Sequence, residues 1–308
     1  MKCLVCGDAS VTPKAVKNTF EHFECTVCNH IFVHPMPTQE TLNSYYRDQY
    51  SYGGETKTVK RGGQKDFRHT IILDFLQYTE INSVLDIGSA DGAFLKGCSD
   101  IGIQSLVGFE PNKSMVQMSN KLGFEIFPNM FSTSYLGQRK FDLINLGDVI
   151  EHVQDPIGFL DEVASALSPG GLLFISTPNV SSPWSRLTFK YYKLFNVPWS
   201  TLTPPEHLNN FSNKSLNALI SKGKFHVILR KYDDASLTYE LGHTHLFRRF
   251  REKRSIKNLL LWVIGWVLYI NTFYICKFFS TDQSERFRMH YVITKDMKRH
   301  YSANLIID

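Results

Sequence analysis

The chain has 308 residues, of which 43% are hydrophobic and 20% charged, a balance that is ordinary for a folded globular protein. This length suggests about two domains, or one large domain with an appendage, and the composition argues against a disordered, fibrous or polytopic membrane protein. The formal net charge of +5 is too small to indicate nucleic-acid binding by itself. The first eight residues hold no apolar run of the kind that a secretory signal needs, so we expect a cytoplasmic protein.

Four cysteines lie near the N-terminus as two Cys-x-x-Cys pairs, separated by eighteen residues. This spacing is typical of a tetrahedral zinc site with four thiolate ligands. Such a site has no open position for substrate, so we expect zinc to stabilise a small zinc-ribbon domain over residues 1–36 rather than to catalyse. The alternative is a set of reduced cysteines or a redox pair. The predicted ligands are Cys3, Cys6, Cys25 and Cys28.

Residues 37–80 are predicted to form a helical connector or lid. Thr38 is the expected N-cap of a first helix, and the apolar residues over 71–76 predict a second helix. Four tyrosines between the two helices either cover a bound ligand or pack the connector, and both alternatives stay open. These tyrosines are Tyr45, Tyr46, Tyr50 and Tyr52.

Strand and helix patterns alternate from residue 83 onward, which predicts a parallel sheet with helices on both faces. Residues 81–240 are the expected core domain, and residues 241–308 are expected to add an apolar helical insertion and the last strand. The fold class is therefore α/β, with a Rossmann-like sheet of seven strands. The strands are expected over 83–87, 105–109, 124–127, 141–146, 171–176, 225–230 and 289–294.

A glycine-containing turn follows the first strand of this domain. Gly88 and Gly92 let the backbone approach a ligand closely, and Glu110, which ends the next strand, can accept hydrogen bonds from ribose hydroxyls. The dinucleotide pattern Gly-x-Gly-x-x-Gly is broken by Ala90. Asp86 would repel a pyrophosphate, but it can hold the ammonium of a cationic sulfonium ligand that has an amino-acid tail. The turn therefore favours S-adenosylmethionine over NAD.

Three segments together resemble the class I S-adenosylmethionine-dependent methyltransferases. They are DIGSADG at 86–92 with Glu110, DLINLGDVIEHV at 142–153 and LSPGG at 167–171. The sequence is most similar to a bacterial subgroup that carries an N-terminal zinc-knuckle domain, whose members act in sugar, polysaccharide and secondary-metabolite pathways. The resemblance covers residues 1 to about 212 well and the remainder loosely, and it implies an antiparallel last strand.

The resemblance assigns cofactor-binding roles around the glycine turn. It implies that Glu110 binds the ribose and that Asn129 and Met130 flank the adenine. Leu146 and Asp148 are expected to close the pocket. The residues at the methionine end are Asp86, Gly88, Ala90 and Gly92.

The sequence departs from the family's pattern in two places, the glycine turn and the segment after the third strand. Ser89 and Ala90 stand where Cys and Gly are usual, which narrows the turn. Met130 stands where an acid often reads the adenine amino group, so adenine is expected to be held by packing and backbone contacts. The alternative without catalysis is a Rossmann-like sheet that binds no cofactor.

Methyl transfer is an in-line displacement, for which the protein aligns the acceptor and removes its proton. By the resemblance, His207 is the leading candidate for the base and Glu206 orients it or binds substrate. The structural alternative is that His207 caps the helix beginning near Ser212 or fills the core. His152, next to Glu151, is the second candidate, although that pair is more often structural.

We therefore expect methyl transfer from S-adenosylmethionine to a small molecule, with a sugar or lipid-linked glycan hydroxyl, nitrogen or carbon as acceptor and no nucleic-acid partner. The alternatives are an NAD-type oxidoreductase and a zinc-ribbon nucleic-acid-binding protein whose Rossmann-like domain is not catalytic.

An apolar stretch over 259–279 follows a cluster of basic residues. Its length approaches that of a membrane span, and its Trp and Tyr residues are typical of membrane interfaces. The strand predicted over 289–294 argues against a span, because that strand should complete the cytoplasmic sheet. A helix on the membrane surface and a packed lid or dimer-forming helix both remain open, so peripheral membrane contact is an expectation here.

Overall fold

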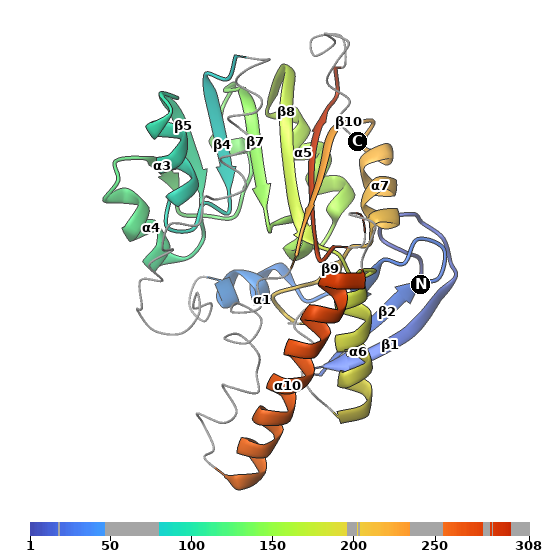
Figure 1. Ribbon diagram of the computed structural model, residues 1–308. Helices are drawn as coiled ribbons and strands as arrows, with labels where there is room; N and C mark the ends of the chain where they lie inside the picture. The colour runs from blue at the N-terminus through green and yellow to red at the C-terminus, as the bar shows by residue number, and fades with distance from the viewer. Residues whose placement is uncertain are drawn as a thin grey trace. The chain divides into compact units, whose positions relative to one another are not determined.

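A computed structural model describes most of the chain (Figure 1). The chain forms two compact units. The helix predicted over 71–76 and two of the four tyrosines, Tyr50 and Tyr52, lie outside the described residues. Unit 1 comprises Met1–Met36, Thr177–Leu219 and Lys231–His290, and unit 2 comprises Pro37–Ser176, Ile220–Arg230 and Tyr291–Asp308. The described residues are 1–17, 19–46, 80–195, 202, 204–234, 255–279, 284 and 286–296.

A seven-stranded sheet, most of which belongs to unit 2, confirms the predicted fold class. Its strand order is β10-β11-β8-β7-β4-β5-β6. The pairs β4–β5, β4–β7, β5–β6 and β7–β8 are all parallel. The strands are β4 (Ser83–Ile87), β5 (Ser105–Phe109), β6 (Glu125–Phe127), β7 (Phe141–Gly147), β8 (Leu167–Pro178), β10 (His226–Asp233) and β11 (Arg288–Thr294).

The last strand, β11, runs antiparallel to β8, as the resemblance implied. At one end the Asn179 amide donates to the Phe287 carbonyl, and at the other the Thr294 hydroxyl donates to the Gly171 carbonyl. The end of β11 therefore lies beside the start of β8. The sheet is mixed, with one antiparallel strand inserted between β8 and β10.

Helices pack against this sheet and begin at well-formed caps. At the start of α4, the Asn112 side chain accepts hydrogen bonds from the amides of Ser114 and Met115. At the start of α5, the Asp155 side chain accepts from the two amides at 157 and 158, and Pro156 occupies the first turn. The strands are buried nearly throughout, as expected for strands covered on both faces. The helices are α3 (Ala93–Asp100), α4 (Lys113–Asn120), α5 (Pro156–Ser165) and α7 (Asn213–Lys222).

The cysteine-rich segment forms a four-stranded sheet in unit 1, of order β1-β2-β3-β9. Its fourth strand comes from far along the chain: Ile31 pairs with Asn210 and Phe32 with Asn209, both antiparallel. A small core of Ile31, Val180 and Leu202 joins these segments. The strands are β1 (Val11–Lys17), β2 (Phe20–Cys25), β3 (Ile31–Val33) and β9 (Asn209–Asn210).

Besides the short 3-10 helices η2 (Thr133–Tyr135) and η3 (Ile150–His152), the described residues form three further α-helices. In unit 2, α1 (Gln39–Ser44) begins at Thr38, whose side chain accepts from the Thr41 amide as predicted. In unit 1, α6 (Pro183–Phe195) and α10 (Ile256–Phe279) run side by side (Figure 1). The Tyr191 hydroxyl lies 2.8 Å from that of Thr272 and joins the pair. Among the described helices, α10 alone is long and apolar enough to cross a membrane, over Asn258–Cys276.

Candidate active site

The turn between β4 and α3 has an unusual backbone. Gly88, Ala90 and Gly92 all have positive φ angles, of 74°, 47° and 79°. The amides of Gly88 and Ser89 donate to the Phe109 carbonyl, which ties the turn to the end of β5. A Cβ added to Gly88 would lie 2.9 Å from Val149 Cγ2. Both the backbone conformation and the limited space therefore favour glycine at position 88.

Glu110 is the first residue after β5, and its carboxylate is held in place by backbone groups. Oε2 accepts from the Ala90 amide at 2.9 Å, and Oε1 accepts from the Asn112 amide at 2.8 Å. Burial raises the pKa of this carboxyl, while the two amides lower it in part. Each oxygen keeps a second lone pair for a further donor such as a ribose hydroxyl.

Asp86 lies within β4, one strand away, and is 1% exposed. The Asn145 side-chain amide on β7 donates to Asp86 Oδ1 at 2.5 Å. Asp86 pairs in register with Gly108 of β5, two residues before Glu110. The structure thus brings Asp86, the glycine turn and Glu110 to the carboxyl ends of neighbouring parallel strands, where open α/β sheets bind ligands.

Asn129 and Met130 lie in the bend that follows β6, where the sequence predicted the adenine site. Aromatic rings gather beside this bend: the ring of Phe109 stacks on Phe127 at 4.8 Å and meets Phe131 edge-on at 5.2 Å. Phe131 is not among the residues that the sequence predicted for this site. The sequence feature that could have indicated it is the spacing of aromatic residues, which occur every four positions at 127, 131 and 135. Such rings provide an apolar surface for a planar base.

The two residues expected to close the pocket differ in their surroundings. Leu146 lies in β7 and is fully buried, so its side chain supports the sheet from the core. Asp148 follows β7, is exposed, and has a φ angle of 56°. Its amide donates to the Ser176 carbonyl and its carboxylate accepts from the Ser176 hydroxyl. Asp148 therefore fixes the turn that packs on Gly88.

His152, the second candidate base, is joined to the connector. The Tyr46 hydroxyl lies 3.0 Å from His152 Nδ1, and the Tyr46 carbonyl accepts from the Asn112 side chain. Asn112 in turn donates to Glu110. Backbone and side-chain hydrogen bonds of Asn112 and Tyr46 therefore connect the Glu110 carboxylate to His152 in three separate steps.

Glu206 and His207 lie in unit 1, at the end of a turn over 204–206, and both are partly exposed. The helix that follows is capped by Ser212, whose hydroxyl accepts from the Ser215 amide. The alternative in which His207 caps this helix is therefore wrong. The next residue, Leu208, accepts from the Val33 amide on β3. The catalytic role of His207 stays a prediction.

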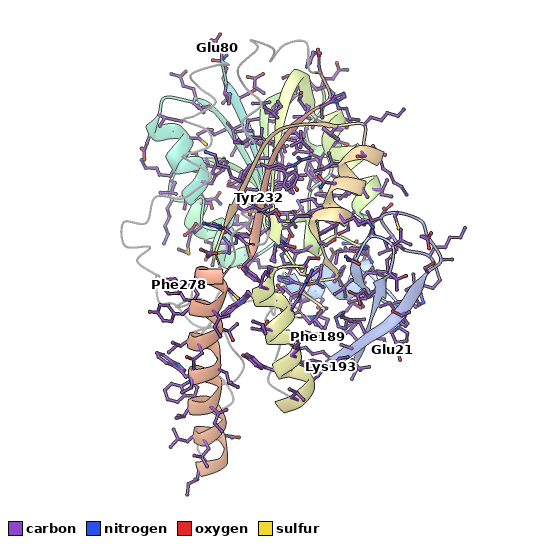
Figure 2. All side chains as sticks on the ribbon, turned by 45° about the vertical axis from the view of Figure 1, so that its right-hand side comes forward. Glu21, Glu80, Phe189, Lys193, Tyr232 and Phe278 are labelled. Atoms are coloured by element: carbon purple, nitrogen blue, oxygen red, sulfur yellow. The ribbon has the colours of Figure 1, made fainter. Side chains whose placement is uncertain are left out.

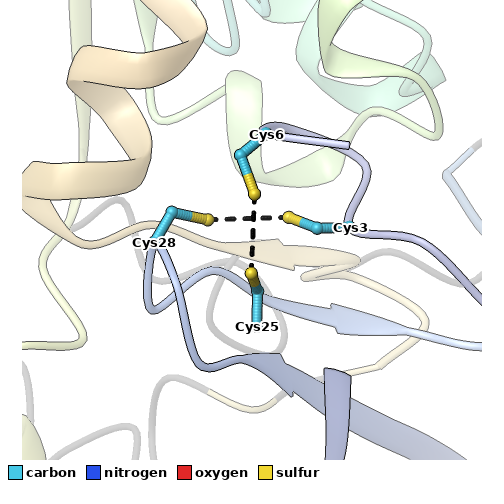
Figure 3. Close-up of side chains that lie close together, drawn as sticks. All are labelled: Cys3, Cys6, Cys25 and Cys28. Atoms are coloured by element: carbon cyan, nitrogen blue, oxygen red, sulfur yellow. Dashed lines mark hydrogen bonds between the residues drawn. The ribbon is translucent and has the colours of Figure 1, made fainter. Parts of the chain in front are cut away.

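The four N-terminal cysteines converge on one point (Figure 3). Their sulfurs all lie within 4.8 Å of one another, with 3.6 Å between Cys3 and Cys28 and 3.5 Å between Cys6 and Cys25. These distances are too long for disulfides. Zinc–sulfur bonds of about 2.3 Å in a tetrahedron place the sulfurs about 3.8 Å apart. The donor set and its geometry therefore fit a structural zinc ion.

Backbone and ring contacts shape this cysteine site. Gly7 and Asn29, which follow the two pairs, have positive φ angles, and their amides donate to the Cys3 and Cys25 carbonyls. His30 Nδ1 lies 3.8 Å from Cys3 Sγ. Contact with Cys28, and more weakly with His30, lowers the pKa of the Cys3 thiol. A metal-binding thiolate is thus favoured at Cys3.

The fold and this site together define a class I S-adenosylmethionine-dependent methyltransferase. A profile described as a methyltransferase domain matches residues 56–228, more than half of the chain, and the chain belongs to this family. The sequence left S-adenosylmethionine and NAD as alternative cofactors, and membership of this family favours S-adenosylmethionine.

Curated relatives share part of the chain. A mitochondrial ubiquinone biosynthesis O-methyltransferase from Dictyostelium discoideum is 30% identical over 154 residues, 42% of this chain and 47% of its own length. A ubiquinone biosynthesis O-methyltransferase from Caulobacter vibrioides is 31% identical over 142 residues, 42% of this chain and 56% of its own. The chain spans about half the length of these relatives.

Among solved structures, the cyclopropane synthase MmaA2 from Mycobacterium tuberculosis is similar with a TM-score of 0.49 and 13% identity, covering 83% of this chain and 94% of its own.

Proposed function

We propose that the chain transfers a methyl group from S-adenosylmethionine to a hydroxyl, nitrogen or carbon of a small molecule, with a sugar or glycan as the first candidate acceptor. The proposal that S-adenosylmethionine is the cofactor is supported by the buried Glu110 carboxylate. The Ala90 and Asn112 amides hold this carboxylate in place, and Asp86 lies on the neighbouring strand. When bound, S-adenosylmethionine supplies the electrophilic methyl group.

The residues around the turn divide the work of binding. Asp86 attracts the cationic amino-acid end, and Glu110 accepts hydrogen bonds from the ribose hydroxyls. The bend at Asn129 and Met130, with the ring of Phe131 beside it, holds the adenine by packing. This division keeps the cofactor in one orientation, which an in-line transfer requires.

His207 is the proposed base, and Glu206 is its proposed orienting or substrate-binding partner. The resemblance supports both roles, and a histidine suits proton removal at neutral pH. Its segment is held by the pairing of β3 with β9 and by the Val33–Leu208 hydrogen bond. His152 is the second candidate, since it lies in unit 2 and is bonded to Tyr46.

The acceptor has two candidate classes. Resemblance to the zinc-knuckle subgroup favours a sugar or glycan. The names of the curated relatives favour a second candidate, the hydroxyl of a ring in a quinone precursor. Both acceptors offer an oxygen that must lose its proton, so the same base serves either of them.

Zinc is proposed as a structural ion, held by the four cysteines. The tetrahedral spacing of their sulfurs supports this role, since four thiolates leave no position for substrate. The proposed ion stabilises the sheet to which β9 belongs and takes no part in the reaction.

Two measurements test these proposals separately. Calorimetry with S-adenosylhomocysteine should show one binding event, and the absence of heat would overturn the cofactor proposal. Turnover is then measured on a panel of sugar nucleotides and prenylated phenols. His207→Ala should lower kcat by about 10²- to 10⁴-fold with unchanged affinity for S-adenosylhomocysteine. His226→Ala, at an exposed position on β10, is the control. Unchanged turnover in His207→Ala would leave His152 as the candidate base.

A further inference from the structure

Helix α10 is apolar on every side, yet among the residues that the structure describes only one side of it is covered. Gly265 and Thr272 are buried where α6 packs, and Phe273 meets the ring of Trp184. Ten large apolar side chains of α10 are 40% to 80% exposed. Figure 2 shows one of them, Phe278, projecting away from α6. A helix that is hydrophobic all round needs an apolar environment on its open side as well.

The two helices at this face, α6 and α10, carry cations and no acidic residue. Arg186, Lys190 and Lys193 follow one another at helical spacing on α6, and all three are exposed. Among the described residues no carboxylate pairs with them. In the sequence, residues 248–254, just before α10, hold five further cations and one acidic residue, Glu252. This pattern is complementary to anionic lipid headgroups.

The order of strands excludes a membrane crossing by α10. In the chain, α10 lies between β10 and β11, which are neighbours in one sheet. A helix that crosses a bilayer would place these two strands on opposite sides unless the chain crossed again. Residues 235–254 carry five cations and no apolar run of spanning length, so they do not provide a second crossing. Both ends of α10 therefore stay on one side.

We propose that α10 lies in the plane of a membrane, with its open apolar face inserted into one leaflet of anionic phospholipid. The exposed cations of α6 lie at headgroup level beside it, and Trp266 occupies the interface. This inference does not depend on the proposed acceptor or on the proposed base. It assigns to unit 1 a membrane-docking role in addition to the methyltransferase activity.

Vesicle flotation of the full chain tests the proposal. Wild-type protein should float with phosphatidylcholine vesicles that contain roughly one third phosphatidylglycerol, and much less with phosphatidylcholine alone. The double variant Leu260→Glu/Val267→Glu places two charges on the open face and should lower partitioning by at least about tenfold. Val16→Glu adds one of the same charges at an exposed position of β1 and should float like the wild type.

Further measurements distinguish the other occupants of this face. Arg186→Ala/Lys190→Ala should reduce binding to the anionic vesicles only, because it removes charge and leaves the apolar face intact. Circular dichroism checks that every variant is folded. The proposal would be overturned if wild-type protein did not float with anionic vesicles. If the wild type were then a dimer and Leu260→Glu/Val267→Glu a monomer, the open face would be assigned to contact with a second copy of the chain. Retention in vesicles after alkaline carbonate extraction would indicate a crossing and would also overturn it.

Discussion

Glu110 shows how one buried carboxylate can organise a binding site. Its two oxygens receive the Ala90 and Asn112 amides, so its position is set by the glycine turn and by the cap of α4 together. Because burial raises the pKa of this carboxyl, protonation begins closer to neutral pH than for an exposed glutamate. The same carboxylate must be ionised to accept hydrogen bonds from a ribose strongly.

Affinity for S-adenosylhomocysteine should therefore depend on pH with a definite sign. As the pH falls through the raised pKa of Glu110, the carboxylate gains a proton and the affinity weakens. Glu110→Gln should bind about tenfold to a hundredfold more weakly at neutral pH, and its affinity should change little on acidification. Calorimetric titrations between pH 7.5 and pH 5 check this. A wild-type affinity that rises as the pH falls would contradict it.

Gly88 offers a second test at the scale of one residue. Gly88→Ala introduces a Cβ 2.9 Å from Val149 Cγ2 at a φ angle of 74°, so strain and overlap add. Gly102 has a φ angle of 96° and no atom within 4 Å of an added Cβ. Gly102→Ala should cost about 1 kcal/mol of unfolding free energy, and Gly88→Ala about 2–4 kcal/mol with loss of cofactor affinity. Denaturant unfolding compares the two variants. Equal losses of unfolding free energy would show that the Val149 side chain moves to make room for the added methyl group.

At the scale of elements, the two-residue strand β9 links the cysteine site to the predicted base. β9 pairs with β3, and the Ser212 hydroxyl after it donates to the Cys28 carbonyl. His207 directly precedes this anchored segment. A metal ion between the cysteines would therefore hold the segment in place without touching the substrate.

Zinc removal should separate binding from turnover. Chelation, or the variant Cys25→Ser, should release about one equivalent of zinc and lower turnover, because β9 loses its anchor. The affinity for S-adenosylhomocysteine should persist, because its predicted ligands all lie in unit 2. Cys276→Ser, outside the cluster, is the control. Equal loss of affinity and turnover would show instead that the cysteine site also supports unit 2.

At the scale of the whole molecule, the chain passes back and forth between its two units. Unit 1 draws on three separate stretches, and residues 1–36 supply only the first. Those residues contribute three of the four strands of their sheet, together with Ile31 of its core. Residues 1–36 are therefore an integral part of unit 1, which also includes α6 and α10.

Deleting residues 1–36 should consequently damage more than a zinc site. β9 would lose its partner strand, and Val180 and Leu202 would lose the core residue against which they pack. We expect poor soluble expression and rapid proteolysis of the remaining unit 1 segments, since exposed strands and apolar residues promote aggregation. Full-length Cys25→Ser should express better than the deletion. A deletion that is stable and soluble would show that the segment is dispensable.

Local patterns predicted much of this structure. The strands over 83–87 and 105–109 begin and end where expected, because buried parallel strands are short apolar runs bounded by turns. The predicted cofactor residues Asp86, Gly88 and Glu110 lie in these strands or directly after them, so sequence adjacency was enough to predict that they lie close together. The pairing of β9 with β3 could not be predicted, because two residues carry no periodicity and their partner lies about 180 positions away. The Tyr46–His152 contact and the burial of Leu146 likewise arise only from tertiary packing.

The position of β11 has a consequence for the order in which the protein is made. β11 is the last of the described strands along the chain, but it lies between β8 and β10. Until a ribosome has released it, β8 presents an unpaired edge and β10 has no neighbour on that side. Nascent chains are expected to be prone to strand-to-strand association over this interval. Completion of the sheet therefore waits until β11 has been synthesised, and termination before β11 should yield aggregates rather than a smaller enzyme.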